Sequence, residues 1–259
     1  MTRRLDSSRT VVANDTYFVG WDVGGWNCDK NGKSRDAIVI LNEDVKIVGQ
    51  PWRGNLRVPI NDNVNTKEWI CALFSLCGIK ANQRANVFMA IDTPLTFSAA
   101  FVELATRLQP VNQIGQSDSN PYLYRDTEHH LFRHGLRPLS AIKDMIGSQA
   151  TKGMHTLAKF APRQQSRGVW TDGIGLTAIE GYPSACKSSE TIMALWSRFR
   201  PLGHEDLDDA LTCAFLAYLF ATDREKLDAP DEYIAPNEGW IWVPKDVIVK
   251  PCFSTPFDQ

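Results

Sequence analysis

The sequence predicts an α/β fold in which one sheet of mixed strand direction is flanked by helices. Short apolar runs alternate with longer amphipathic segments, and two apolar runs near the start are close enough to form a hairpin. The 259 residues include 28 Lys and Arg against 30 Asp and Glu, and 43% are hydrophobic. This composition is typical of a globular protein and excludes a disordered chain, a coiled coil and a general polycation.

The chain is expected to form a polar N-terminal tail over 1–15 and a single domain over 16–250. A stretch at about 95–172 has weak signals. It is interpreted as an insertion that carries function, because long structureless stretches are uncommon inside compact folds. The longest apolar run, 210–221, falls short of the ~20 residues that cross a bilayer, so no membrane contact is expected. Six cysteines without a C-x-x-C pair predict a reduced, cytoplasmic protein.

The first half of the chain contains four predicted strands and a helix. Residues 17–22 form an apolar run that stops at Asp22 before two glycines, typical of a buried strand and a tight turn. Three polar residues separate the apolar runs 36–41 and 45–48, which predicts a hairpin. Residues 66–76 have helical apolar spacing, with Thr66 as the expected N-cap. Residues 86–92 then repeat the first pattern, an apolar strand that ends in an aspartate.

The second half begins with the weaker signals. Helices are expected over 98–108 and from Tyr124, with a loop over 109–121 between them. Residues 176–180 form a third apolar run that ends in an acid, and 239–244 form a last short strand. Between these two strands, 206–222 has one broad apolar face, which predicts a long amphipathic helix.

The acidic residues at the ends of these elements are the candidate site. Asp22, Asp92 and Glu180 end three predicted strands, and open α/β sheets bind ligands at the carboxyl edge of their strands. Asp206 and Asp209 lie three residues apart and project from one face of the first helical turn. Gathered carboxylates raise one another's pKa unless a cation lies between them, and oxygen ligands without His or Cys suit Mg²⁺ or Mn²⁺.

Each acid also has a structural interpretation. Asp206 or Asp208 suits a helix N-cap, and Asp92 before Thr-Pro suits a turn. Glu180 and Asp22 interrupt apolar runs, where an unpartnered carboxylate costs several kcal/mol. The joint occurrence of these acids therefore favours a functional site.

Six short motifs, in order along the chain, resemble those of domain-of-unknown-function family 429, a family of predicted nucleases thought to adopt the ribonuclease H fold. The motifs are Val19–Asp22, Ile91–Leu95, Tyr124–Glu128, Ile179–Pro183, Asp206–Leu211 and Glu238–Pro244. A more distant similarity links the acids to Holliday-junction resolvases. The resemblance implies a ribonuclease H-like sheet of three antiparallel strands followed by parallel ones, with flanking helices.

The resemblance also implies a divalent-metal-dependent nuclease that hydrolyses phosphodiester bonds in DNA or RNA. The implied catalytic residues are Asp22, Asp92, Glu180 and Asp209, and the implied metal ligands are Asp22, Asp92, Asp206 and Asp209. Asp22 would bridge two Mg²⁺ or Mn²⁺ ions, Asp92 would hold one, and Asp209 with Asp206 the other. Glu180 would be a further ligand or an outer-shell residue that orients one.

The segment 133–167 is strongly basic, with seven Lys or Arg and one acid in a chain whose net charge is −2. It is interpreted as a clamp for a nucleic-acid backbone, and the alternative is a solvated surface. The candidate nucleic-acid contacts are Arg125, Lys143, Lys152, Lys159, Arg163 and Arg167. Arg125 and Glu128 form either a helix-surface ion pair or a polar cluster that faces the acidic site.

Other functional classes remain as alternatives. The turn Asp22–Gly25 is similar to the first phosphate loop of sugar kinases and their actin-like relatives, although a second glycine-rich turn is missing. A ribonuclease H-fold binding module without catalysis is a further alternative. His130 and His134, close to His129, have the spacing of zinc ligands but lack an evident third ligand. The oligomeric state is left open.

Overall fold

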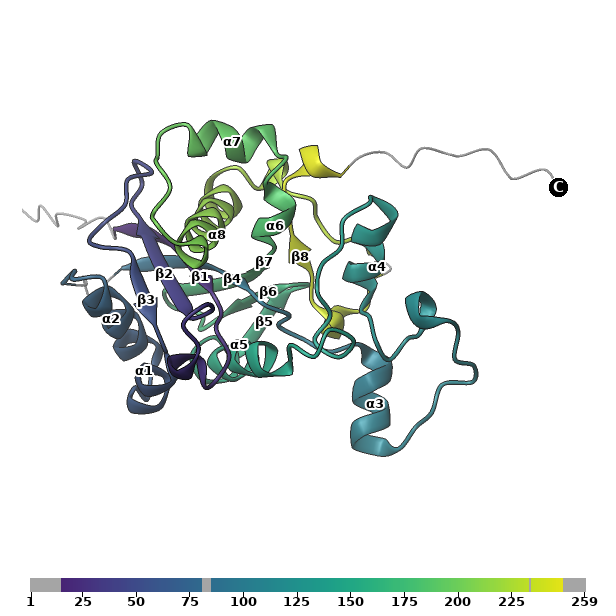
Figure 1. Cartoon of the computed structure of the whole chain (residues 1–259). Helices are drawn as coiled ribbons and strands as arrows, with labels where there is room; N and C mark the ends of the chain where they lie inside the picture. The colour runs from purple at the N-terminus through teal and green to yellow at the C-terminus, as the bar shows by residue number, and fades with distance from the viewer. Residues whose placement is uncertain (1–14, 81–84, 233, 249–259) are drawn as a thin grey trace, which may run out of the picture.

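A single mixed sheet forms the centre of the protein (Figure 1). The computed structural model describes residues 15–80, 85–232 and 234–248, so most of the predicted N-terminal tail lies outside the described residues. The strand order is β3-β2-β1-β4-β7-β6-β5, and β8 pairs with β7 outside this path. The strands are β1 Thr16–Asp22, β2 Asp36–Leu41, β3 Trp52–Gly54, β4 Asn86–Asp92, β5 Arg163–Ser166, β6 Val169–Thr171, β7 Leu176–Gly181 and β8 Ile241–Trp242.

The directions of the strands confirm the predicted mixed sheet. β1, β2 and β3 are antiparallel neighbours, whereas β4 is parallel to β1, and β7 is parallel to β4. β6 and β5 continue the sheet in antiparallel fashion, and β8 runs parallel to the end of β7. This arrangement is consistent with a ribonuclease H-like sheet, and it brings the ends of the three parallel strands to one edge.

The described part of the chain contains eight α-helices. They are α1 Arg57–Asp62, α2 Thr66–Leu76, α3 Ala99–Arg107, α4 Asp126–Arg133, α5 Gly147–Phe160, α6 Pro183–Cys186, α7 Glu190–Trp196 and α8 Glu205–Thr222. Short 3-10 helices lie at Cys28–Lys30, Ser117–Ser119, Arg224–Lys226, Pro236–Glu238 and Lys245–Val247. In the parts that the structure describes, no helix is both long and apolar enough to span a membrane.

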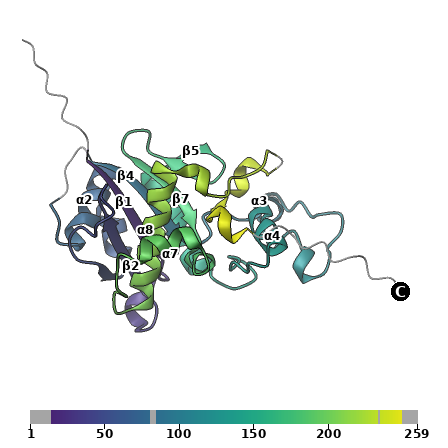
Figure 2. The ribbon, with the colours of Figure 1, turned by 90° about the horizontal axis from the view of Figure 1, so that it is seen from above.

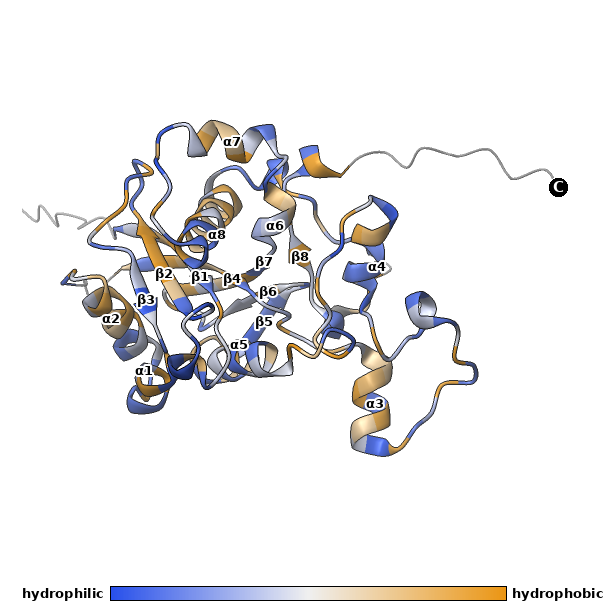
Figure 3. Ribbon diagram, viewed as in Figure 1, coloured by the Kyte–Doolittle hydropathy of each residue, from blue (hydrophilic) through white to orange (hydrophobic). Residues whose placement is uncertain are grey.

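The two faces of the sheet bury separate cores. α8 covers one face, where Phe18 packs among the helix's apolar residues, and α2 and α5 cover the other, where Val19 and Trp21 pack (Figures 1 and 2). This division follows from the alternation of side chains along β1. Gly20 permits the close approach of α8, since a Cβ there would lie 1.8 Å from the Ala210 carbonyl oxygen. Figure 3 shows the apolar colouring of α8, which belongs to the first core, and of β2, whose side chains alternate between the two cores.

Several element predictions need correction. Residues 45–48 form no strand, because Val45 takes a positive φ of 56° in a turn and Ile47 makes only one bridge to Leu41. β3 takes the place next to β2 instead. The N-cap of α2 is Asn65, whose side chain accepts from the Glu68 N–H, and Thr66 is the first helical residue.

The predicted insertion is shorter than expected, because β5 and β6 within it belong to the sheet. The remainder contains α3, α4 and α5. α3 and α4 lie beyond the edge of the sheet in both views, and α3 has no buried residue (Figures 1 and 2). By contrast, α5 packs under the sheet through Leu157 and Phe160.

Candidate functional site

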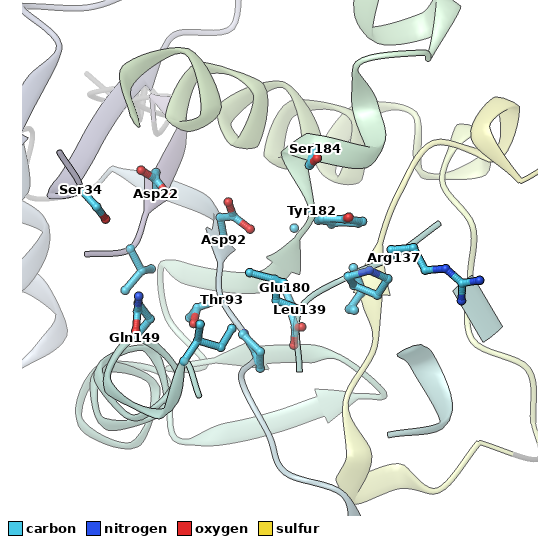
Figure 4. Close-up of a pocket in the computed structure, with 16 residues that line it drawn as sticks. Asp22, Ser34, Asp92, Thr93, Arg137, Leu139, Gln149, Glu180, Tyr182 and Ser184 are labelled. Atoms are coloured by element: carbon cyan, nitrogen blue, oxygen red, sulfur yellow. The ribbon is translucent and has the colours of Figure 1, made fainter. Parts of the chain in front are cut away.

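Asp22 and Asp92 form the centre of the candidate site. They are the last residues of β1 and β4 and are register partners across the parallel pair, so their side chains lie side by side on the same face. Both are partly buried and line a cavity of about 430 Å³ at the carboxyl ends of the strands (Figure 4). The predicted meeting of these two acids is confirmed.

Asp209 of α8 adds a third charge to this pair. Burial and the charge of Asp92, followed by Asp206 and Asp209, raise the pKa of Asp22 well above its usual range. Burial, Asp209 and Glu180 raise the pKa of Asp92 to about 8. Burial also raises the pKa of Asp209, against the opposing charge of Lys187. Among the described residues, no ion pair or hydrogen bond neutralises Asp22, Asp92 or Asp209, so the cluster repels itself.

Asp206 differs from these three acids because protein donors occupy it. Its Oδ2 accepts the Arg35 N–H at 2.9 Å and the Arg53 Nε at 2.7 Å. These bonds tie the first turn of α8 to β3 and to the residue that precedes β2. They do not support the prediction that Asp206 is a metal ligand, and we assign it to holding α8 in place. The N-cap of α8 is His204, not an aspartate.

Glu180 is also occupied. It is the last residue but one of β7 and pairs in register with Ile91, so it points to the opposite face of the sheet from Asp92. Both its oxygens accept from Arg125, at 2.6 and 2.8 Å, and one accepts the Leu95 N–H at 2.9 Å. Arg125 also pairs with Glu128 at 2.7 Å, and the Arg125 and Glu180 side chains are each only 2% exposed. Arg125 is therefore part of a buried cluster next to the site. The prediction that it contacts phosphate is not supported, and both oxygens of Glu180 are already engaged by protein donors.

Lys152 was another predicted nucleic-acid contact, and its side chain is 0% exposed. Its Nζ donates to Asp36 Oδ2 at 2.7 Å, and Asp36 also accepts the Gly24 N–H and the Leu56 N–H. This buried pair joins α5 to the turn after β1. Because the Gly24 N–H is committed to Asp36, the turn lacks one donor that a phosphate loop would use.

The other predicted basic contacts do not form one clamp. Lys143 pairs with Asp144 at 3.2 Å, and Lys159 donates to the Ile60 carbonyl at 2.6 Å. Arg167 donates to the carbonyls of Ile234 and Glu232, whereas Arg163 is exposed on β5. Most of the basic side chains in this segment therefore form contacts within the protein itself.

The cavity includes side chains that the sequence did not single out. They are Ser34, Arg137, Leu139, Gln149, Tyr182 and Ser184 (Figure 4). Tyr182 belongs to the motif Ile179–Pro183, and this motif is the sequence signal that could have identified it. Arg137 lies in the basic segment and forms no ion pair with any residue that the structure describes. Ser34 and Gln149 carry no sequence signal, since only the folded chain brings them to the strand ends.

The donors fit a hard cation better than zinc. Asp22, Asp92 and Asp209 offer only oxygen, as Mg²⁺ and Mn²⁺ prefer. Among the described residues, no three His, Cys, Asp or Glu side chains form a ready-made metal site. Mg²⁺ usually keeps several waters and uses one or two carboxylates with substrate phosphates, so it does not need such a cage. His130 instead bonds Asp228 at 2.8 Å, which leaves the zinc interpretation unsupported.

Fold and site together define an α/β protein whose ribonuclease H-like sheet has an acidic cavity at the ends of its parallel strands. No family model, no curated protein and no solved structure matches this chain. The resemblance to family 429 therefore stays a prediction, and the proposed function rests on the residues of the cavity.

Proposed function

We propose that this protein is a divalent-metal-dependent nuclease that hydrolyses phosphodiester bonds in nucleic acid. One observation carries the proposal. Asp22 and Asp92 are side by side on neighbouring parallel strands, line a cavity, and have no cationic partner among the described residues.

Asp22, Asp92 and Asp209 would hold Mg²⁺ or Mn²⁺. A bound divalent cation supplies positive charge for the leaving oxygen and lowers the pKa of a bound water. It also relieves the repulsion that raises the pKa of Asp92 to about 8. The bonds of Asp206 to Arg35 and Arg53 hold the helix turn that carries Asp209.

Glu180 and Arg125 have a supporting role in this proposal. Their bidentate ion pair, at 2.6 and 2.8 Å, fixes the end of β7 and keeps the Glu180 carboxylate directed at the protein. The two residues thus shape the wall of the cavity without binding the metal ion. Arg137 lines the cavity, but its guanidinium lies over the Phe132 ring and points away from the two aspartates (Figure 4), so it is a contact for a phosphate at the rim and not at the acids.

The proposed partner is nucleic acid, and the proposed location is the cytoplasm. The described cysteines are all free thiols, which supports a reducing compartment. The kinase-like alternative has less support, because the Gly24 N–H donates to Asp36 and not to a phosphate. Close packing also explains why this residue is a glycine, since a Cβ at Gly24 would lie 2.7 Å from the Arg35 carbonyl carbon.

The test is Mn²⁺-dependent cleavage of DNA and RNA by the purified wild type and by Asp22→Asn. We expect cleavage that requires the cation and that the substitution abolishes. Glu205→Gln is the matched control, because it removes an exposed carboxylate from the first turn of α8 and should leave cleavage unchanged.

Isothermal calorimetry of Mn²⁺ on the same proteins separates the alternatives. Metal binding without cleavage of any substrate would indicate a binding module that has lost its chemistry. Undiminished cleavage by Asp22→Asn would show that the site lies elsewhere.

A further inference from the structure

We infer that the acidic cavity admits one unpaired nucleotide and excludes a double helix. This inference rests on the proposed nuclease function and adds the class of substrate. It depends on the walls of the cavity, which come from the segment between α4 and α5 and from the first turn of α5, and which face the strand ends that carry the acids.

The cavity has a floor and two walls. Asp22, Asp92 and Tyr182 belong to the strand ends, whereas Leu139 lies in the segment between α4 and α5 and Gln149 in the first turn of α5. Figure 4 shows Gln149 and Leu139 across the cavity from Ser184 and the two aspartates. The acids are therefore at the base of a recess and not on an open surface.

Buried anchors hold these walls. The Lys152–Asp36 pair at 2.7 Å fixes α5, and the Arg125–Glu180 pair at 2.6 Å fixes the start of α4. Glu238 accepts the Ala99 N–H and the Asp126 N–H, both at 2.7 Å, and so fixes the starts of α3 and α4. Displacing a wall would leave buried charges without partners, which costs several kcal/mol.

The size of the cavity suits a nucleotide. Its volume of about 430 Å³ lies at the small end of the range for pockets that enclose small organic ligands, about 300 to 1,000 Å³. A duplex presents its phosphates with the paired strand and both neighbours attached. Those parts would meet the walls before a phosphate could reach Asp22 and Asp92.

The chemistry of the walls also suits a nucleotide. Leu139, Ile146 and Tyr182 offer apolar and aromatic surface to a base, and Arg137 offers a cation to a neighbouring phosphate. Leu139 is 56% exposed although it is apolar, so its side chain is available at the rim. Base edges that a duplex buries by pairing are free to enter only when the nucleotide is unpaired.

The test measures binding by fluorescence anisotropy in Ca²⁺, with one labelled oligonucleotide offered as a single strand, as a blunt duplex and as a duplex with an unpaired overhang. We expect the single strand and the overhang to bind at least about tenfold more tightly than the blunt duplex. Competition with a nucleoside monophosphate and with a dinucleotide distinguishes a free nucleotide from part of a strand as the preferred ligand.

Two variants tie the preference to the cavity. Leu139→Asp should weaken single-strand binding about tenfold, because it removes apolar surface that a base would contact and adds a negative charge at the rim. Met145→Asp adds the same charge on the same segment at a side chain that is 89% exposed and does not line the cavity, so it should leave binding unchanged.

The outcomes separate this inference from the proposed function. Equal or tighter binding of the blunt duplex, or equal effects of the two variants, would overturn the inference even if the protein cleaves DNA or RNA. Selective single-strand binding without Mn²⁺-dependent cleavage would support the cavity and overturn the nuclease proposal. Failure to bind any of these probes would overturn both.

Discussion

Asp22 and Asp92 are register partners at the ends of two adjacent parallel strands, and burial together with neighbouring carboxylates raises the pKa of Asp92 to about 8. A sheet edge that collects like charges in this way is unfavourable for the metal-free fold. The pair therefore lowers the stability of the metal-free fold, and that loss is measurable.

The stability of the metal-free protein should fall as the pH rises. The ordinary pKa of an aspartate is 3.8, and that of Asp92 in the folded protein is about 8. Between these values the folded state binds more protons than the unfolded state, so the contribution of Asp92 is present at low pH and is lost as the pH approaches 8. Asp92→Asn should flatten this dependence and raise the Tm at pH 8 by about 3 °C in thermal unfolding with EDTA. A variant no more stable than wild type at pH 8 would contradict the prediction.

Divalent cations should stabilise the folded protein. Millimolar Mg²⁺ or Mn²⁺ binds the folded state preferentially if it sits between Asp22, Asp92 and Asp209, and a concentration of about 100 Kd corresponds to about 2.7 kcal/mol. We expect a Tm several degrees higher in Mn²⁺ than in EDTA for the wild type, and no such shift for Asp22→Asn. An equal shift in both proteins would place the ion at another site.

Arg125→Met should destabilise the fold strongly. The substitution leaves Glu128 and Glu180 as buried carboxylates without a cation, and loss of one partner of a buried pair costs about 3 to 5 kcal/mol. Urea unfolding checks this value. Arg163→Met, an exposed arginine on β5, is the control and should change the free energy of unfolding by less than about 0.5 kcal/mol. Equal stability of both variants would exclude a structural role for Arg125.

Gly20→Ala should prevent α8 from packing correctly. A Cβ at this position would lie 1.8 Å from the Ala210 carbonyl oxygen, and backbone cannot move aside as a flexible side chain can. We expect a large loss of stability, about 3 kcal/mol or more, in chemical denaturation. Gly32→Ala is the matched control, since nothing lies within 4 Å of its added Cβ. A fully stable Gly20→Ala protein would mean that α8 can shift away from β1.

The sequence predicted the acidic strand ends because their signal is local. Each apolar run ends at its acid, and the parallel order then brings Asp22 and Asp92 together. The basic residues were misinterpreted for the opposite reason. The sequence around Lys152 does not reveal that Asp36, far away in the chain, takes its charge. A count of charges cannot distinguish a solvated lysine from one that is paired inside the protein.

The residues that form the walls of the cavity could not be predicted from the local sequence either. Arg137, Leu139 and Gln149 reach the strand ends only through the docking of α4 and α5. Residues 45–48 show another limit, since their apolar pattern suits a strand but Val45 adopts a left-handed turn. In this second case the cause is local, because Asn42 accepts the N–H groups of Val45 and Lys46 and so closes a turn.

Glu238 gives this fold an order of assembly during synthesis. Its carboxylate completes the first turns of α3 and α4, yet it follows Ala99 by 139 residues and Asp126 by 112. Because a chain emerges from the ribosome at about 5 to 20 residues per second, both helix starts lack this acceptor for several seconds after they are made. The starts of α3 and α4 are thus completed only after β1, β4 and β7 have been made, and a chain that stops before Glu238 lacks the acceptor that holds both helix starts.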